Sequence, residues 1–248
     1  RIIGAGLETS PITSASFKIK GSLSNVTIPG SPFTLGGTPR VSWTVHGDIG
    51  NVKVRYYDDQ VPTWKDITTL SASIGYYDIL LDAANNIVNA SNGALIDVTD
   101  TDTPSVTAVT ASTFMVKPLF TITKPSSSDN AWKVGDTTHN VEWIKKGANI
   151  SKVALDYFED GNIDYTPLTG PAGEFDGQGD VINDNSFNWT PIPNDIKSTK
   201  IFKIRIRSIP TGDVWAVTYE SASADKFKII GILQMYTPSE STGIKWRA

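Results

Sequence analysis

The stretch Val41-Ser42-Trp43-Thr44-Val45 recurs one hundred residues later as Val141-Glu142-Trp143-Ile144, and this recurrence sets the expected fold. In the first copy apolar residues alternate with polar ones, which places Val41, Trp43 and Val45 on one buried face of a β-strand. The same V/I-x-W pattern occurs again at Ile244–Trp246, so the two spacings are 100 and 103 residues. The tryptophans therefore predict a repeat of small domains, each with a tryptophan in its core.

A second short signature, F-x-I, follows a similar rhythm at Phe17–Ile19, Phe120–Ile122 and Phe227–Ile229. A period of about a hundred residues is too long for a solenoid turn and suits a string of separate domains. The seven residues from Phe17 match the seven from Phe227 better than either matches those from Phe120, which leaves open a larger repeat of two modules. We expect four segments: residues 1–19 end a preceding module, 20–117 form module 1, 118–230 form module 2, and 231–248 start a further module.

The composition favours a secreted β protein. The 248 residues carry a net charge of −4, and only 19% of them are charged. This balance argues against nucleic acid as a partner, because phosphates select clustered Lys and Arg. The chain has no cysteine, so neither disulfides nor thiolate chemistry is available. It also has no apolar run of roughly 18 residues that would span a membrane, and no basic cluster for a lipid surface.

Strand patterns separated by turn residues occur throughout both modules, and helical periodicity is nearly absent. In module 2, Val153-Ala154-Leu155-Asp156-Tyr157 aligns with Val52 to Tyr56 of module 1, and Gly147 aligns with Gly47. About seven short strands per hundred residues are typical of a β-sandwich. The fold class we expect is all-β, with tandem Ig-like or fibronectin-III-like sandwich modules.

Module 2 resembles a known family over nearly its whole length. The motifs that carry the resemblance are W-x-V-G at Trp132–Gly135, V-x-W at Val141–Trp143, F-N-W-T-P-I-P at Phe187–Pro193, K-I-R-I-R-S at Lys203–Ser208 and S-A-D-K-F-K-I at Ser223–Ile229. Together they are similar to the Ser/Thr-rich, GPI-anchored-type repeat domain related to yeast Knh-like cell-wall proteins. Module 1 is a poorer match because it lacks the N-W-T-P segment. The resemblance implies an extracellular β-sandwich, and it supplies no catalytic residues.

Metal sites are the first kind of chemistry to consider. The two histidines, His46 and His139, do not fall at equivalent positions, and no zinc-protease, nucleophile-elbow or phosphate-loop spacing is present. Acidic groups in predicted turns are better candidates, because hard oxygen ligands close together hold Ca²⁺. The main calcium candidates are Asp156, Glu159, Asp160 and Asp164, and the further ones are Asp58–Asp59 and the group Asp176, Asp180 and Asp184. Turns also favour Asp for its local hydrogen bonds, so a purely structural role is the competing interpretation.

Two further features concern the surface. Trp64 and Trp215 lie outside the repeated core pattern, so each is either a stacking platform for sugar rings or a packing residue. Four N-x-S/T sequons mark candidate glycosylation sites, at Asn25, Asn89, Asn149 and Asn188. Asn188 lies between Phe187 and Trp189 and should point to the opposite face.

The hypothesis that the sequence favours is a non-enzymatic structural segment of a large protein on the cell surface: a stalk, a fibre or an envelope lattice. Its expected partners are neighbouring modules or other copies of the chain, since open sandwich edges can pair between chains. Short connections between the modules predict a semi-rigid rod. The alternative is an adhesin or a carbohydrate-binding appendage of a secreted enzyme, with a cell-wall glycan as its ligand. We expect no cofactor apart from the calcium considered above.

Overall fold

The computed structural model describes residues 15–16, 18–129, 131–168, 180–182, 184–196, 200–208, 220–222 and 226–231. Within these ranges the regular secondary structure consists of strands, apart from two three-residue 3₁₀ helices, η1 (Ala72–Ile74) and η2 (Ala83–Asn85). The all-β prediction is confirmed. Ile244–Trp246, Trp215, Asp176 and Phe17 lie outside the described residues.

Module 1 is a sandwich of two sheets. One sheet has the order β1 (Ser22–Thr27), β3 (Arg40–His46) and β6 (Tyr76–Asp78). The other has the order β2 (Phe33–Thr34), β9 (Phe114–Lys117), β7 (Ser91–Asp100), β4 (Asn51–Asp58) and β5 (Thr63–Ser71), and β8 (Thr107–Val109) also pairs with β7. The short β2 runs parallel to β9, while the other pairs are antiparallel. This strand order is that of an immunoglobulin-type sandwich.

Module 2 repeats the arrangement, except that two short strands pair with β13 (Lys152–Glu159) where β5 alone pairs with β4. Its smaller sheet has the order β10 (Leu119–Lys124), β12 (His139–Lys146) and β16 (Ser186–Trp189). Its larger sheet has the order β11 (Trp132–Lys133), β19 (Phe227–Ile230), β17 (Ile201–Ser208), β13 and β14 (Thr166–Pro167), with β15 (Asp180–Ile182) on β13 and β18 (Glu220–Ala222) on β17. The pair β11 and β19 is again parallel. Both modules therefore have the Ig-like fold.

The V-x-W residues lie in the cores as predicted. Val41 and Val141 are fully buried, and Trp43 and Trp143 are only 5% and 2% exposed. Trp43 also donates its indole N–H to the Ala72 carbonyl at 3.0 Å, which satisfies the polar atom of this buried ring. Each module has its own cluster of buried apolar side chains, so each sandwich has a separate core.

The F-x-I signature, in contrast, does not mark one structural position. Phe120–Ile122 lies in β10, the first strand of module 2, whereas Phe227–Ile229 lies in β19, its last strand. The register shows the true equivalents, because Val116 pairs with Phe33 just as Ile229 pairs with Trp132. Phe114-Met115-Val116 is therefore the counterpart of Phe227-Lys228-Ile229. Once the strands are aligned in this way, the match of Phe17 with Phe227 gives no separate evidence for a two-module repeat.

Candidate functional site

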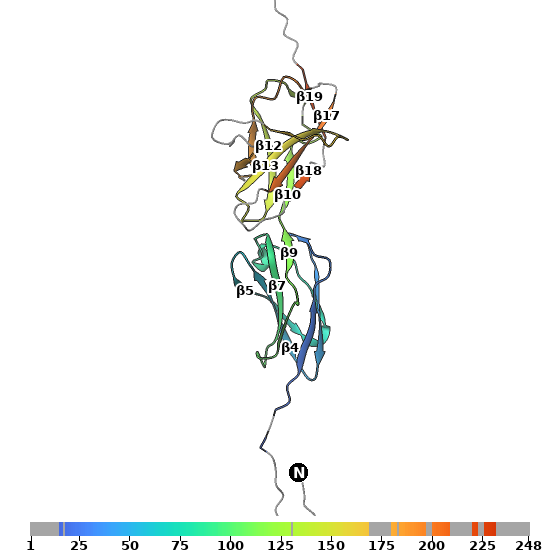
Figure 1. The fold of residues 1–248 in the computed structure, drawn as a ribbon, viewed down its shortest axis with the longest axis vertical. Coiled ribbons are helices and arrows are strands. Elements are labelled where there is room, and N and C mark those ends of the chain that lie inside the picture. Colours follow the sequence, from blue (N-terminus) through green and yellow to red (C-terminus); the bar gives the residue numbers. More distant parts are fainter. Residues whose placement is uncertain are drawn as a thin grey trace, which may run out of the picture.

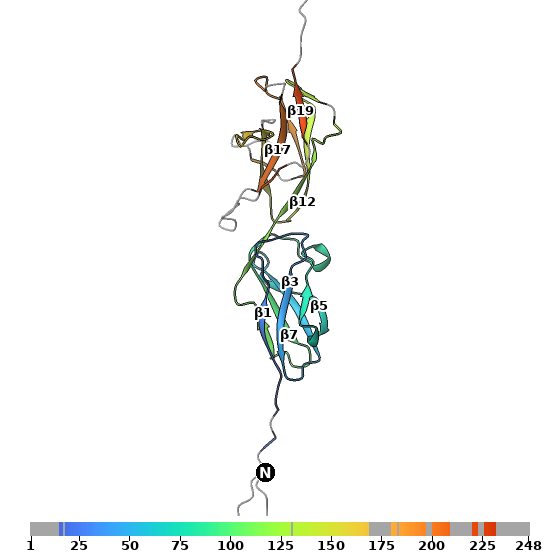
Figure 2. The same ribbon diagram turned by 90° about the vertical axis from the view of Figure 1, so that its right-hand side faces the viewer.

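The two modules lie end to end along the long axis of the described chain (Figures 1 and 2). The last strand of module 1, β9, ends at Lys117, and the first strand of module 2, β10, begins at Leu119. Pro118 is the whole connection, and its ring restricts the backbone φ angle at this point. The junction between the modules is the candidate functional site.

The loop after β12 packs closely against Pro118. Gly147 has a φ of +130°, and a Cβ added to it would lie 3.0 Å from the Cβ of Pro118. Ile150 follows in the loop and is 2% exposed in the core of module 2. Position 147 therefore favours glycine, both for its backbone conformation and for the close approach of the linker.

The side chain of Asn149 fastens the same loop to module 1. Its Oδ1 accepts a hydrogen bond from the Ala90 backbone N–H at 3.0 Å, and its Nδ2 donates to the Ala90 carbonyl at 2.9 Å. Next to it, the Ala148 N–H donates to the Val88 carbonyl at 2.8 Å. These three hydrogen bonds cross the junction, and the two made by Asn149 hold both the N–H and the carbonyl of Ala90, as a β-bridge does.

Apolar contacts also cross the junction. Ala90 of module 1 is fully buried within the core cluster of module 2, and Met115 on β9 packs against that cluster. The two modules therefore share an interface of buried side chains in addition to the linker and the hydrogen bonds.

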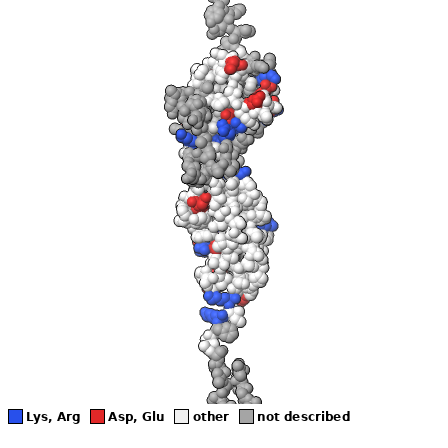
Figure 3. Space-filling view, in the orientation of Figure 1, with Lys and Arg blue, Asp and Glu red and all other residues white. Residues whose placement is uncertain are grey.

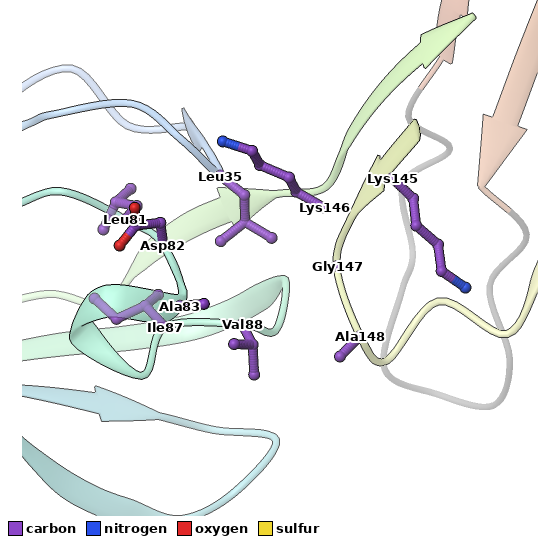
Figure 4. A pocket seen from close by; sticks show the side chains of 10 residues that line it. All are labelled: Leu35, Leu81, Asp82, Ala83, Ile87, Val88, Lys145, Lys146, Gly147 and Ala148. Atoms are coloured by element: carbon purple, nitrogen blue, oxygen red, sulfur yellow. The ribbon is translucent and has the colours of Figure 1, made fainter. Parts of the chain in front are cut away.

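Beside these contacts lies a cavity of about 460 Å³ between the modules (Figure 4). Its lining is mainly aliphatic, with charged groups at the rim, and comprises Leu35, Leu81, Asp82, Ala83, Ile87, Val88, Lys145, Lys146, Gly147 and Ala148. Figure 4 shows the Lys146 side chain extending over Leu35, whereas Lys145 points away from module 1. The Lys146 Nζ lies 2.6 Å from where a Cβ on Gly36 would be, so Gly36 leaves the space that this lysine occupies.

The calcium candidates do not converge in the structure. Asp156 is buried between Arg205 and Arg207, each at 2.8 Å. Glu159 pairs with Lys200 at 2.5 Å, and Asp164 is exposed. Within the described part of the chain, no group of three metal-ligating side chains is placed to hold an ion.

Asp160 faces cations as well. It pairs with Lys226 at 2.6 Å and with Lys203 at 3.2 Å, and hydrogen bonds from these two lysines hold its pKa below the ordinary value. Asp156, Glu159 and Asp160 therefore have separate basic partners. Calcium binding stays a prediction of the sequence.

The other acidic candidates also have local partners. Asp58 is fully buried and accepts hydrogen bonds from Lys65 at 3.1 Å and from Asn89 at 3.0 Å. Asp59 accepts one from Ser91 at 2.5 Å. Asp184 accepts one from the Ser186 N–H at 3.2 Å, and of Asp180 only the backbone is described.

The histidines lie at strand ends in different modules. His46 ends β3, and its Nε2 lies 3.2 Å from the Ser24 hydroxyl. His139 begins β12, stacks on Trp132 at 4.6 Å and lies 2.9 Å from the Asp136 carboxylate. The structure does not bring the two together.

Trp64 is 37% exposed on β5 and is partly covered by its neighbours. Its ring lies 5.4 Å from that of Tyr57, and the Arg55 guanidinium lies 5.3 Å from the ring centre. Module 2 has the same arrangement around Tyr165, a residue that the sequence analysis did not single out.

Tyr165 is 39% exposed, 5.1 Å from Phe158 and 3.2 Å from the guanidinium of Arg205. The constant offset of 101 residues from Tyr57 to Phe158 and from Trp64 to Tyr165 is the signal that could have identified this pair.

The four sequons differ in accessibility. Asn25 is exposed, and Asn188 is half-buried and points away from Phe187 and Trp189, as expected. Asn89 is only 8% exposed and donates to Asp58, while the Asn149 amide holds Ala90. A glycan on Asn89 or Asn149 would remove these hydrogen bonds from the folded chain.

No family model matches the sequence, and no curated protein sequence does. Among solved structures, similar chains include three domains of the outer capsid protein Hoc of bacteriophage RB49 (14% identity, 86% of this chain and 59% of that one, TM-score 0.25). A second is the eight N-terminal Ig domains of the Down syndrome cell adhesion molecule (12% identity, 86% of this chain and 25% of that one, TM-score 0.33). A third is the BSP domain of a biofilm-associated protein (12% identity, 85% of this chain and 30% of that one, TM-score 0.24). The chain thus spans 59% of the first of these chains and 25% of the second. Because all three TM-scores are below 0.5, the fold assignment rests on the strand order.

Within the described ranges, no helix has the length and apolar character needed to cross a bilayer. Charged side chains are sparse on the face of module 1 that Figure 3 shows.

Proposed function

We propose that this chain is a non-enzymatic spacer: a stiff two-module segment of an extracellular surface protein that forms a stalk, a fibre or an envelope lattice. The observation that carries the proposal is the double hydrogen bond from Asn149 to Ala90 beside a one-residue linker. Ig-like modules that moved freely on flexible linkers would not keep such a contact. We also propose that the chain is related to the Ser/Thr-rich, GPI-anchored-type repeats that its sequence resembles. Its partners in this proposal are neighbouring modules or other copies of the chain.

The test is whether the two modules move as one body. Residual dipolar couplings measured on the whole chain should give the same alignment tensor for module 1 and module 2. The variant Asn149→Ala loses two hydrogen bonds across the junction and should give two different tensors. Asn140→Ala is the matched control, because Asn140 is exposed on β12. Different tensors for the unmodified chain would contradict the spacer function.

A second candidate, glycan binding, is favoured by the partly exposed Trp64 and Tyr165 at equivalent positions of the two modules. Sugar rings stack on aromatic faces. Titration with cell-wall polysaccharide should then shift the NMR signals around both rings, and Trp64→Ala and Tyr165→Ala should each abolish one set of shifts.

Tyr76→Ala is the control for this titration, since Tyr76 is also exposed (42%) and also lies next to an arginine, at 4.2 Å, but belongs to the other sheet. Shifts that persist in the Trp64 and Tyr165 variants would rule out this candidate.

A further inference from the structure

The N-terminal end of module 1 repeats the packing that joins module 1 to module 2. A Cβ on Gly21 would lie 2.5 Å from Ile49, and a Cβ on Gly47 would lie 3.2 Å from the Gly21 Cα. At the junction, a Cβ on Gly147 would lie 3.0 Å from the Cβ of Pro118 and 3.3 Å from Ile150. Gly21 therefore occupies the position of the linker residue Pro118.

The residues before Gly21 fit the end of another module. Phe17-Lys18-Ile19-Lys20-Gly21 has the pattern of Phe114-Met115-Val116-Lys117-Pro118 and of Phe227-Lys228-Ile229-Ile230-Gly231. Ile19 is 88% exposed, whereas its counterparts Val116 and Ile229 are fully buried in the last strands of their modules. Ile19 thus has the sequence position of a core residue without the burial of one.

The joint at Gly21 lacks the features that stiffen the Pro118 joint. Glycine replaces proline, so the ring that restricts φ is missing. Between Gly47 and Ile49 the loop holds only Asp48, whereas between Gly147 and Ile150 it holds both Ala148 and Asn149. No residue of this shorter loop takes the place of Asn149. Gly231, which is exposed, is likewise a glycine at the linker position after β19.

We propose that Gly21 and Gly231 are hinged joints to further modules of the same build, so that modules 1 and 2 form the stiff unit of a longer, jointed array. The inference rests on the proposed spacer function and adds a partner to it. That partner is the C-terminal end of another such module, which docks on the surface formed by Gly21, Gly47 and Ile49. Bending is then confined to every second joint.

The test is a concatemer in which residues 1–230 of one copy are followed directly by residues 21–248 of a second copy. The chain has no cysteine, so single cysteines give clean spin labels. Thr38→Cys with Ser151→Cys in one copy reports on the Pro118 joint, and both side chains are exposed. Thr137→Cys in the first copy with Gly50→Cys in the second reports on the new joint at the equivalent positions.

We expect a narrow distance distribution across the Pro118 joint, and one with a similar centre but several-fold greater width across the glycine joint. Asn149→Ala should widen the first distribution toward the second. A glycine joint as narrow as the Pro118 joint would overturn the hinge, and a distribution with no preferred distance would overturn the docking surface. A broad distribution at the Pro118 joint itself would instead overturn the spacer function, so the two failures are distinguishable.

Discussion

Arg55 on β4 and Asp97 on β7 lie opposite each other in register and form an ion pair of 2.6 Å, and module 2 has the same pair with the charges exchanged. There Asp156 on β13 lies opposite Arg205 on β17, at 2.8 Å. In each module the arginine also lies against the aromatic ring described above, Trp64 or Tyr165. The outer face of the larger sheet thus carries an arginine–aspartate pair at the same position in both modules, with the charges on exchanged strands.

Removing the arginine of this pair should destabilise module 1. In Arg55→Ala the Asp97 carboxylate, whose side chain is 1% exposed, loses its cation, and we expect a loss of about 3 kcal/mol in the free energy of unfolding. Urea unfolding measures the change. The double variant Arg55→Asp with Asp97→Arg copies the arrangement of module 2 and should recover most of the loss.

Lys53→Ala is the control for this prediction. Lys53 and Asp66 also form an ion pair, at 2.7 Å, but their side chains are 41% and 61% exposed. Exposed pairs contribute less than about 1 kcal/mol. If the Lys53 and Arg55 variants lost the same free energy of unfolding, burial would not explain the contribution of the Arg55–Asp97 pair.

The repeated tryptophans should be the most sensitive core positions. Trp143→Ala removes a side chain that is 2% exposed and should lower the stability of module 2 by about 3–5 kcal/mol through lost burial and the cavity left behind. Calorimetry should show the module 2 transition at a lower temperature and the module 1 transition nearly unchanged, because the cores are separate. A joint shift of both transitions would show that the modules unfold as one unit.

A comparison of two glycines isolates the junction. Gly161→Ala introduces a Cβ at a φ of +88° with nothing within 4 Å, so its expected effect is the backbone strain alone, about 1–2 kcal/mol. Gly147→Ala adds contact with Pro118 at 3.0 Å, and its φ of +130° lies further than that of Gly161 from the left-handed region that an L-residue can adopt. It should therefore cost more in urea unfolding, and it alone should change the alignment tensors of the two modules. Equal effects of the two variants would show that the linker yields easily.

We expect module 1 to lose stability in alkali because of Tyr56. Burial, followed by the negative charge of Asp58, raises the pKa of the Tyr56 phenol well above its ordinary value near 10. Below that value both the folded and the unfolded chain keep the proton, so the stability is unaffected. Above it the unfolded chain loses the proton first, and the free energy of unfolding falls by about 1.4 kcal/mol per pH unit from this group.

The variant Tyr56→Phe has no phenol to ionise, so between pH 10 and 11 its stability should fall less steeply than that of the unmodified chain. Among the described residues the Tyr56 hydroxyl makes no hydrogen bond of normal geometry, although the nearby Ser91 side chain lowers its pKa, so the variant should keep most of its stability at neutral pH. The free energy of unfolding is measured with urea at pH 10 and pH 11. If it falls equally between the two pH values in both proteins, the prediction is wrong.

The sequence by itself determined the fold class and the cores. Alternation in Val41–Val45 and Val52–Tyr56 is a local property, because neighbouring side chains of a strand point to opposite faces. Strand patterns and turn residues therefore predicted the sandwiches, with Trp43 and Trp143 inside them.

Only the tertiary structure decided which residues meet across the fold. The F-x-I motif suits both a first and a last strand, so its position required the pairing of β2 with β9 and of β11 with β19. The acidic clusters were candidate ligands until the arginines and lysines of β17 and its neighbours were placed opposite them. In the sequence Asn149 was only a candidate glycosylation site. Its hydrogen bonds to Ala90 could not be predicted, because the two residues lie 59 positions apart in the chain. Contacts between residues so distant in the chain depend on how the modules stack, and local sequence patterns do not determine this stacking.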